Sequence, residues 1–269
     1  MHSHRLILDR PAPGVLNMAI DEALLLEAAE NDAITLRFYQ WNEPTVSLGY
    51  FQHYEDRHEH AASRICAVVR RQTGGGAILH DRELTYSLTL PASHPLARDT
   101  KKLYAAVHET FIATLSAAIT GDRSRWILKR NDQESKTSPA AEPFLCFERR
   151  AIGDVILSAS SAPSTSSTSE VTQLNWKILG SAQRRHRGAI LQHGSLLLHA
   201  SPAAPELAGL GDLIGQDFEI GSVAAEVSSR FEDHLGMRFE ASRLSAELKS
   251  KAAHIANTKY GSPSWTKRR

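Results

Sequence analysis

The period of the hydrophobic residues changes along the chain, and these changes predict where strands and helices lie. Ile34, Leu36 and Phe38 alternate with the polar residues Thr35 and Arg37, which predicts a strand with one buried face. The same alternation, or a short apolar run between polar segments, predicts further strands over residues 45–50, 65–69, 84–90, 126–129, 154–157, 176–182 and 189–198.

Helical spacing separates these groups of strands. Helices are predicted over residues 18–30, 101–120, 223–235 and 244–255. We expect Asn17 to cap the first helix, with Asp21 and Glu22 in its first turn, where carboxylates interact favourably with the helix dipole. Gly236 is placed to end the third helix. The order of a helix, several strands, a helix, several strands and two helices predicts an α+β fold with a largely antiparallel sheet.

Composition narrows the class of protein. The 269 residues include 31 Lys+Arg and 30 Asp+Glu, so the formal net charge is only +1, which argues against bulk nucleic-acid binding. No apolar stretch is long enough for a membrane span, and the N-terminal apolar patch of residues 6–8 is too short for a signal peptide. Two cysteines, Cys66 and Cys146, form no disulfide framework. We therefore expect a cytoplasmic protein.

A serine-rich segment interrupts the second group of predicted strands. Residues 158–170 hold seven Ser and two Thr among thirteen residues, with almost nothing to bury. Because strand-like sequence resumes on both sides, this segment, at about residues 158–172, is interpreted as a flexible insertion rather than a linker between domains.

The strongest chemical signal is the run Arg70-Arg71-Gln72-Thr73-Gly74-Gly75-Gly76 between two predicted strands. Three glycines let a ligand approach bare backbone N–H groups, and two arginines can hold an anionic group. The alternative is a glycine-rich hairpin turn with solvated arginines. The neighbouring His80 and Asp81 favour ligand binding, although the run matches neither of the common nucleotide-binding glycine motifs.

Three weaker signals follow. Lys177 lies in an apolar strand, so its ammonium needs a polar cleft or a path to the surface. His193 stands beside Gly194 and is either structural or part of a site. Cys146 has apolar neighbours, as a buried inert cysteine would. It becomes a nucleophile only if a cation such as Lys177 favours its thiolate.

A fourth cluster, His53, His58, Glu59 and His60, contains metal-ligand residue types. It lacks the spacing of a zinc-binding helix and lies in a polar, charge-rich stretch. We expect no metal site there.

Taken together, these signals resemble the biotin/lipoate protein ligase superfamily, and most closely its octanoyltransferases and lipoate–protein ligases. The matching stretches are residues 17–22, 47–52, Arg-Arg-x-Thr-Gly-Gly-Gly-Ala-x-x-His-Asp at 70–81, residues 84–87, Lys-Ile-x-Gly-Ser-Ala-Gln at 177–183, and residues 191–194. The resemblance implies one catalytic domain over residues 1–269, without a C-terminal accessory domain. Its fold would be a central, mainly antiparallel mixed sheet flanked by helices.

The resemblance also implies a reaction. Cys146-Phe147 resembles the cysteine–phenylalanine pair of cysteine-dependent octanoyltransferases, in which the cysteine carries an acyl thioester. The donor would be octanoyl-acyl carrier protein, and the acceptor a lysine of a lipoyl domain or of the glycine cleavage H protein. Cys146 and Lys177 would be catalytic, with Asp154 at the position of an expected acidic residue. No cofactor would be needed, because a thioester is already activated.

Two other functions stay open. An ATP-dependent lipoate–protein ligase would act through lipoyl-AMP and need ATP and magnesium. Arg70, Arg71 and the glycines would then hold the adenylate phosphate, and Cys146 would be a bystander. The third is a non-catalytic acyl- or adenylate-binding regulator, against which Lys177 argues, since binding alone needs no cation at a reacting carbonyl.

The resemblance further implies a set of substrate-binding residues. They are Arg70, Arg71, Thr73, Gly74, Gly75, Gly76, Ala77, His80, Tyr86, Gly180, Ser181, Ala182, Gln183, His193 and Gly194. Backbone N–H groups near residues 75–77 and 180–182 would stabilise an oxyanion. Two positions depart from related patterns. Ala151 replaces a usual serine, and Ile190 stands where another transferase subtype carries its cysteine, which disfavours that subtype.

Overall fold

Strands and helices alternate through the part of the chain that this computed structural model describes, which is residues 4–120, 126–133, 143–159 and 174–269. The strands are β1 (His4–Leu8), β2 (Ile34–Tyr39), β3 (Thr45–Leu48), β4 (Ala67–Arg70), β5 (Ile78–His80), β6 (Glu83–Leu90), β7 (Trp126–Arg130), β8 (Val155–Ala159), β9 (Leu174–His186), β10 (Ala189–Leu197) and β11 (Glu240–Ser242). The α-helices are α1 (Gly14–Asn31), α2 (Thr100–Ala118), α3 (Leu210–Ile214), α4 (Ile220–Leu235), α5 (Ala246–Ile255) and α6 (Pro263–Thr266).

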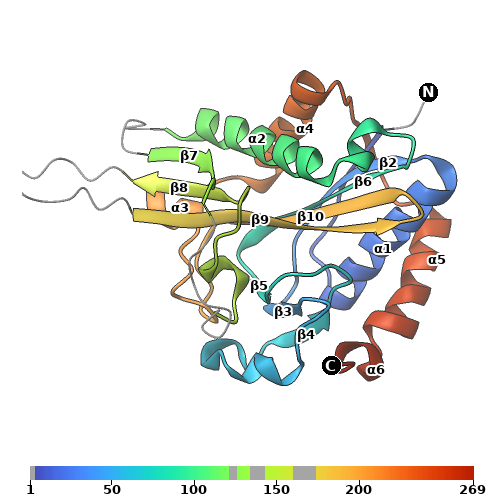
Figure 1. The fold of residues 1–269 in the computed structure, drawn as a ribbon, viewed down its shortest axis with the longest axis horizontal. Helices are drawn as coiled ribbons and strands as arrows, with labels where there is room; N and C mark the ends of the chain where they lie inside the picture. Colours follow the sequence, from blue (N-terminus) through green and yellow to red (C-terminus); the bar gives the residue numbers. More distant parts are fainter. Residues whose placement is uncertain (1–3, 121–125, 134–142, 160–173) are drawn as a thin grey trace, which may run out of the picture.

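Eight of the strands form one sheet in the order β11-β1-β2-β6-β10-β9-β8-β7 (Figure 1). Its neighbours are antiparallel except for β11–β1 and β1–β2. The predicted α+β fold with a mainly antiparallel mixed sheet is therefore confirmed. The strands β4-β3-β5 form a separate small sheet, which the alternation of residues along each strand did not indicate.

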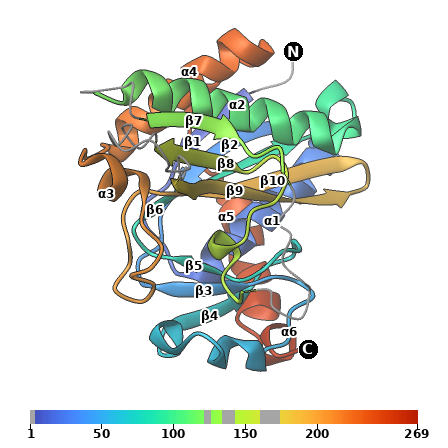
Figure 2. The same ribbon diagram turned by 60° about the vertical axis from the view of Figure 1, so that its left-hand side comes forward.

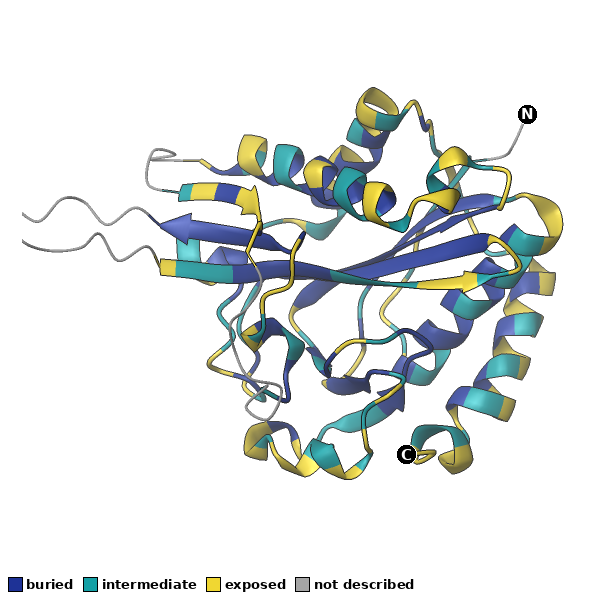
Figure 3. Cartoon of the chain, in the orientation of Figure 1, coloured by how far each residue is buried: buried dark blue, intermediate teal, exposed yellow. Residues whose placement is uncertain are grey.

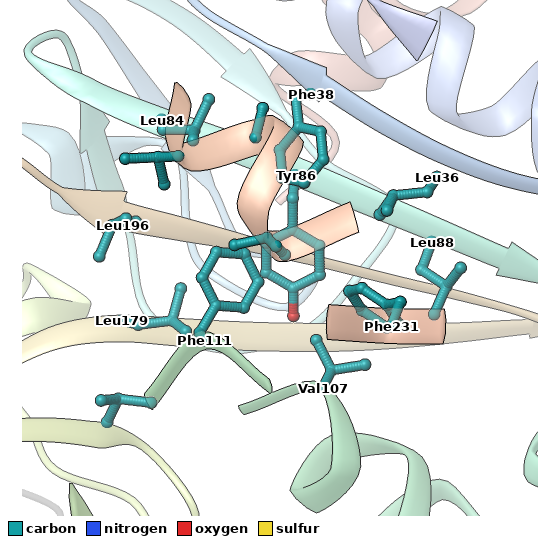
Figure 4. Close-up of a cluster of buried hydrophobic side chains, with 14 of the residues drawn as sticks. Leu36, Phe38, Leu84, Tyr86, Leu88, Val107, Phe111, Leu179, Leu196 and Phe231 are labelled. Atoms are coloured by element: carbon teal, nitrogen blue, oxygen red, sulfur yellow. The ribbon is translucent and has the colours of Figure 1, made fainter. Parts of the chain in front are cut away.

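One face of the large sheet carries the main hydrophobic core. Leu84, Tyr86 and Leu88 of β6 point to this face, where Phe111 of α2 and Phe231 of α4 pack on them (Figure 4). These side chains are buried, because alternate residues of a strand point to the same face. Figures 1 and 2 show α2 and α4 lying along this side of the sheet.

The opposite face is more polar and carries the site described below. Helix α1 packs on it against β6 and β10, with α5 on its outer side (Figure 2). Thr85 and Ser87 of β6 and His193 and Ser195 of β10 point to this face, because they alternate with residues of the core. All of them are buried even so, and the central strands are dark blue along most of their length in Figure 3.

The first helix differs from the prediction at its N-terminus. Helix α1 begins at Gly14, and Pro13 precedes it without a side-chain cap. Asn17 lies inside the helix and donates from its amide to the carbonyls of Ala12 and Gln40. The expectation that Asn17 is the N-cap was wrong, because its side chain is engaged in tertiary hydrogen bonds. Asp21, one turn further on, faces the sheet rather than the helix N-terminus.

Other boundaries agree with the sequence patterns. Asp99 caps α2, its carboxylate accepting from the backbone N–H of Lys102. Helix α4 ends at Gly236, which has a φ of 63° and so adopts the left-handed conformation that glycine favours. Strand β8 reaches Ala159, and the rest of the predicted insertion, from residue 160 on, falls outside the described residues. Within the described chain, no helix has the length and apolar character to cross a membrane.

Candidate active site

A pocket opens on the polar face of the large sheet, between β9, β10 and the small sheet. Its lining residues are Met18, Tyr39, Ser47, Arg71, Gly74, Gly75, Ile78, His80, Thr85, Cys146, Phe147, Gly180, Ser181, Ala182, His193, Gly194 and Ser195. Ten of the residues proposed from the sequence are among them, although they come from four distant segments.

Cys146 opens a short 3-10 turn, Cys146–Glu148, at the side of the pocket. Its backbone N–H donates to the carbonyl of Ala77 at 2.6 Å, and the N–H of Ala77 donates to the carbonyl of Phe144 at 3.2 Å. These two hydrogen bonds fasten the cysteine segment to the end of the glycine run. The thiol is partly exposed, unlike that of a buried core cysteine.

Lys177 reaches Cys146 from the neighbouring strand β9. Its Nζ lies 3.5 Å from the Sγ of Cys146, 3.3 Å from the same residue's carbonyl oxygen and 2.9 Å from Oδ2 of Asp154. Burial alone would lower the pKa of Lys177, but Cys146 and Asp154 together raise it above its ordinary value. Lys177 is therefore an ammonium at neutral pH, held between a carboxylate and a thiol.

A β-bulge precedes the point where this lysine reaches Cys146. Val155 pairs with Leu179 and Ile156 pairs with Lys177, so Ile178 is an extra residue in β9. Bulges turn a side chain away from the regular alternation and often occur beside active sites. A Cβ on Gly180 would lie 2.6 Å from Cε of Lys177, so only glycine leaves room for the lysine there.

Asp154 is itself held in place by two further donors. The backbone N–H of Ala151 donates to its Oδ2 at 2.7 Å, and the hydroxyl of Tyr104 donates to its Oδ1 at 2.9 Å. The Tyr104 hydroxyl also accepts from the N–H of Ser181 at 3.2 Å. The carboxylate is almost fully buried, and its contacts fix both its position and its orientation toward Lys177.

Arg71 braces the glycine run from inside. Its guanidinium donates to the carbonyls of Ser47, Gly74 and Gly76 at 2.6–2.8 Å. Gly75 has a φ of +93°, a conformation that a side chain would strain. Burial lowers the pKa of Arg71 to about 10, an effect that Cys146 opposes, so the guanidinium stays charged at neutral pH.

Arg70 turns away from the pocket, which corrects its expected place in the substrate site. Its guanidinium donates to the carbonyls of Gly49 at 2.9 Å and Gln52 at 2.7 Å, and its Nε donates to the carbonyl of Thr266 at 3.0 Å. The physical reason is that Arg70 is the last residue of β4 and Arg71 follows it, and adjacent residues of an extended chain point to opposite sides. Arg70 fastens the C-terminal segment to the loop after β3.

Four other predicted residues stand behind the lining. Tyr86 points to the hydrophobic core, and its hydroxyl shares a hydrogen bond of 2.6 Å with Oγ of Ser181. Gln183 donates to the carbonyl of Thr100. Gly76 and Ala77 belong to the end of the glycine run to which the cysteine segment is hydrogen-bonded, but they do not line the pocket. These residues support the pocket rather than form its surface.

His193 connects the pocket to a buried network. Its Nε2 lies 2.8 Å from Oγ1 of Thr73, and its Nδ1 lies 3.2 Å from Oδ2 of Asp21. Burial would raise the pKa of Asp21, but His193 and Arg37 lower it, so Asp21 is a carboxylate. This arrangement holds the His193 ring beside the glycine run, through its contact with Thr73.

A second buried carboxylate, Glu83, contacts three residues that line the pocket. Its Oε1 lies 2.6 Å from Nδ1 of His80 and accepts from Oγ1 of Thr85, while its Oε2 accepts from Ser195. Trp41 stacks on His80 with ring centroids 3.9 Å apart. Thr85 and Ser195 also line the pocket; they were not predicted as site residues, although both are polar positions in alternating strands and could be found from that pattern.

The histidine cluster after β3 forms no ligand set in the described chain. His58 pairs with Glu55 at 3.4 Å, and His60 pairs with Glu206 at 2.9 Å. Within the described ranges, no three His, Cys, Asp or Glu side chains lie close enough together to bind a metal ion.

Comparison with known proteins gives consistent relatives. Residues 13–229 match the model for the lipoyl protein ligase A/B catalytic domain. Octanoyltransferase LipM of Kyrpidia tusciae is 30% identical over 297 aligned positions, which cover 100% of both chains. In fold, protein Ta0514 of Thermoplasma acidophilum, solved with bound lipoic acid, superposes with a TM-score of 0.71 at 22% identity, over 100% of both chains. A bipartite lipoate protein ligase from that organism, described with its E2 lipoyl domain, gives 0.67 at 20% identity, covering 99% of this chain and 97% of that one.

Proposed function

This chain belongs to the lipoyl protein ligase A/B catalytic-domain family, and we propose that it is an octanoyltransferase of protein lipoylation that works through a thioester on Cys146. One observation carries the proposal. The ammonium of Lys177 lies 3.5 Å from the Sγ of Cys146 at the wall of the pocket. A cation at that distance favours the thiolate, which is the nucleophilic form of cysteine.

In the first step, the Cys146 thiolate attacks the carbonyl carbon of an octanoyl thioester. A carbon–sulfur bond forms to Sγ, the bond to the carrier's sulfur breaks, and the carrier leaves as a thiolate that takes a proton from water. The thiol proton of Cys146 passes to solvent, and the ammonium of Lys177, 3.5 Å from Sγ, stabilises the negative charge on the attacking sulfur. Octanoate is then held as a Cys146 thioester.

In the second step, the neutral amine of an acceptor lysine attacks this thioester. An amide bond forms, the bond to Sγ breaks, and Cys146 returns to the thiolate beside Lys177. The amine's excess proton passes to solvent. The same ammonium therefore favours the attacking sulfur in the first step and the departing sulfur in the second.

Both steps pass through an oxyanion that needs hydrogen-bond donors. The N–H of Ala77 donates to Phe144, and that of Ser181 donates to Tyr104, so two of the groups expected from the sequence are engaged. The N–H groups of Gly75 and Gly76 donate to no atom of the described chain. Gly75 lines the pocket whereas Gly76 does not, so we assign the oxyanion to the N–H of Gly75, together with the ammonium of Lys177.

The octanoyl chain would occupy the pocket, whose exposed surface is mostly apolar. The donor is octanoyl-acyl carrier protein, and the acceptor is a lipoyl domain or the glycine cleavage H protein. The ligase described with its E2 lipoyl domain supports an acceptor of this kind. Because the donor arrives as a thioester, the reaction requires no ATP, metal or other cofactor.

An ATP-dependent ligase is less well supported by the site. In a ligase, Arg70 and Arg71 would hold the adenylate phosphate. In the structure, Arg70 instead binds backbone carbonyls away from the pocket, and Arg71 braces the glycine run. A non-catalytic acyl-binding protein would have no use for the buried ion pair between Lys177 and Asp154.

Intact mass of the purified protein after incubation with octanoyl-acyl carrier protein tests the proposal. We expect one octanoyl adduct on the wild type that hydroxylamine removes, as it removes thioesters. Cys66→Ala is the matched control and should be acylated like the wild type, whereas Cys146→Ala should gain no adduct.

Failure has a distinct signature. An octanoyl transfer rate for Cys146→Ala equal to that of the wild type refutes the cysteine mechanism. Pyrophosphate release that depends on ATP and lipoate, with no adduct from the thioester donor, establishes the ligase instead.

A further inference from the structure

Three arginines lie over two aromatic rings beside the pocket. The guanidinium of Arg184 lies 5.8 Å from the ring centroid of Tyr50, that of Arg268 lies 4.4 Å from the same ring, and that of Arg269 lies 5.5 Å from the ring of Phe51. These three arginines and two rings are called the cationic rim below. The three arginines are exposed.

The charges of the rim are not neutralised within the protein. Within the described residues, none of the three arginines takes part in an ion pair. Arg268 and Arg269 act on the buried Arg70, where burial lowers the pKa and the two arginines lower it further, while Asp56 opposes them. Asp56 is thus the acidic group whose charge acts on Arg70, and its carboxylate accepts from the backbone N–H of His53.

The rim is continuous with the pocket. Arg184 follows the lining residue Ala182 by two positions in β9, so both side chains point to the same face of the sheet. Phe51 packs on Gly74, which also lines the pocket, and Tyr50 donates from its N–H to the carbonyl of Thr73 at 2.8 Å. Both parts of the rim are therefore next to residues that line the pocket.

We propose that the cationic rim is the docking surface for the acyl donor, and that it binds the acidic surface and the phosphodiester-linked arm of the carrier protein. This inference rests on the proposed function. Guanidinium groups recognise phosphate and carboxylate oxygens, and the donor's thioester is carried on an arm attached through phosphate. The acceptor instead offers a neutral amine, which a guanidinium does not bind as it binds phosphate or carboxylate oxygens. Charge therefore assigns the rim to the first substrate rather than to the second.

Charge reversal tests the assignment. The double variant Arg268→Glu with Arg269→Glu, and the single variant Arg184→Glu, are compared with Arg243→Glu, an exposed arginine before α5. Acylation of Cys146 is measured with two donors, octanoyl-acyl carrier protein and octanoyl-N-acetylcysteamine, which has neither phosphate nor carrier. We expect KM for the carrier to rise about tenfold or more in the rim variants, with kcat and the small donor changed less than twofold.

A binding measurement separates docking from chemistry. Cys146→Ala is titrated with octanoyl-acyl carrier protein in the presence and absence of rim charge reversal, and we expect Kd to rise about tenfold, with a smaller effect at 0.5 M NaCl because salt screens exposed charges.

Each outcome decides one question. Equal losses on both donors, an unchanged Kd, or a rise only in the acceptor's KM overturns the docking assignment. If the carrier binds through the rim but never acylates Cys146, the cysteine mechanism fails and the docking surface stands.

Discussion

Removing the charge of Asp154 tests whether this carboxylate sustains the Lys177 ammonium beside Cys146. Asp154→Asn keeps the shape of the side chain and removes its charge. Lys177 is then left buried, with Cys146 as its remaining electrostatic partner of opposite sign. Since burial lowers the pKa of Lys177 and Asp154 raises it, the substitution favours the neutral amine and withdraws the cation that favours the thiolate.

The distances give the magnitude. Two opposite charges separated by the observed 2.9 Å interact by about 6 kcal/mol at an effective dielectric constant of about 20. Leaving one member of a buried pair without its partner costs about 3 kcal/mol or more of folding stability. If part of that cost is relieved by deprotonation of Lys177, the thiolate becomes scarcer, and we expect acylation and alkylation of Cys146 to slow by about 100-fold at pH 7.

The rate of alkylation by iodoacetamide reports the thiolate without involving the donor or acceptor, and urea unfolding gives the stability. Tyr104→Phe is the control, because it removes one hydrogen bond to Asp154 and keeps the charge. It should cost about 1 kcal/mol and leave alkylation within about threefold. A folded Asp154→Asn variant that alkylates at the wild-type rate refutes the reasoning.

Three further predictions follow from other contacts. Burial lowers the pKa of His108 to about 4, so between about pH 6.5 and 4 the unfolded chain binds a proton that the folded chain does not, and stability is lost as the pH falls. Urea unfolding should show a loss of about 2 kcal/mol from pH 7 to pH 5, most of which His108→Gln abolishes; an unchanged pH dependence in that variant contradicts this prediction. Gly180→Ala should fold, by circular dichroism, yet acylate at least about 100-fold more slowly, because a Cβ displaces Lys177; acylation at the wild-type rate would show that the lysine needs no such room. Arg70→Lys should lower the free energy of unfolding by about 2 kcal/mol while KM for the octanoyl donor changes less than twofold, and a large rise in KM would return Arg70 to the substrate site.

Alternation along the chain predicted which residues of the central strands are buried in the core. Leu84 and Leu88 lie there, whereas Thr85 between them lines the pocket. Successive residues of a strand point to opposite faces of the sheet. The same logic explains why Tyr86, proposed as a substrate contact, belongs to the core. A motif can be right about a segment and still misassign a residue whose parity in the strand is opposite.

The sequence patterns did not predict which distant strands pair with one another. The parallel contacts of β1 with β2 and β11, and the separate small sheet, join segments whose own periodicity is compatible with several partners. The contact of His193 with Asp21 spans 172 positions, so no local spacing contains it. Helix α1 began earlier than expected for a related reason, because the side chain that looked like its cap binds two distant carbonyls.

The meeting of Cys146 and Lys177 depends on features that separately look structural. The cysteine segment is fastened to the glycine run at Ala77, and a bulge in β9 turns the lysine toward it. Gly180 leaves the space that the lysine crosses. Each feature taken alone is an ordinary hydrogen bond, an irregular strand or a small residue. Together they hold a buried cation against a partly exposed thiol, an arrangement that costs stability and is therefore best explained by the reactivity it gives the sulfur.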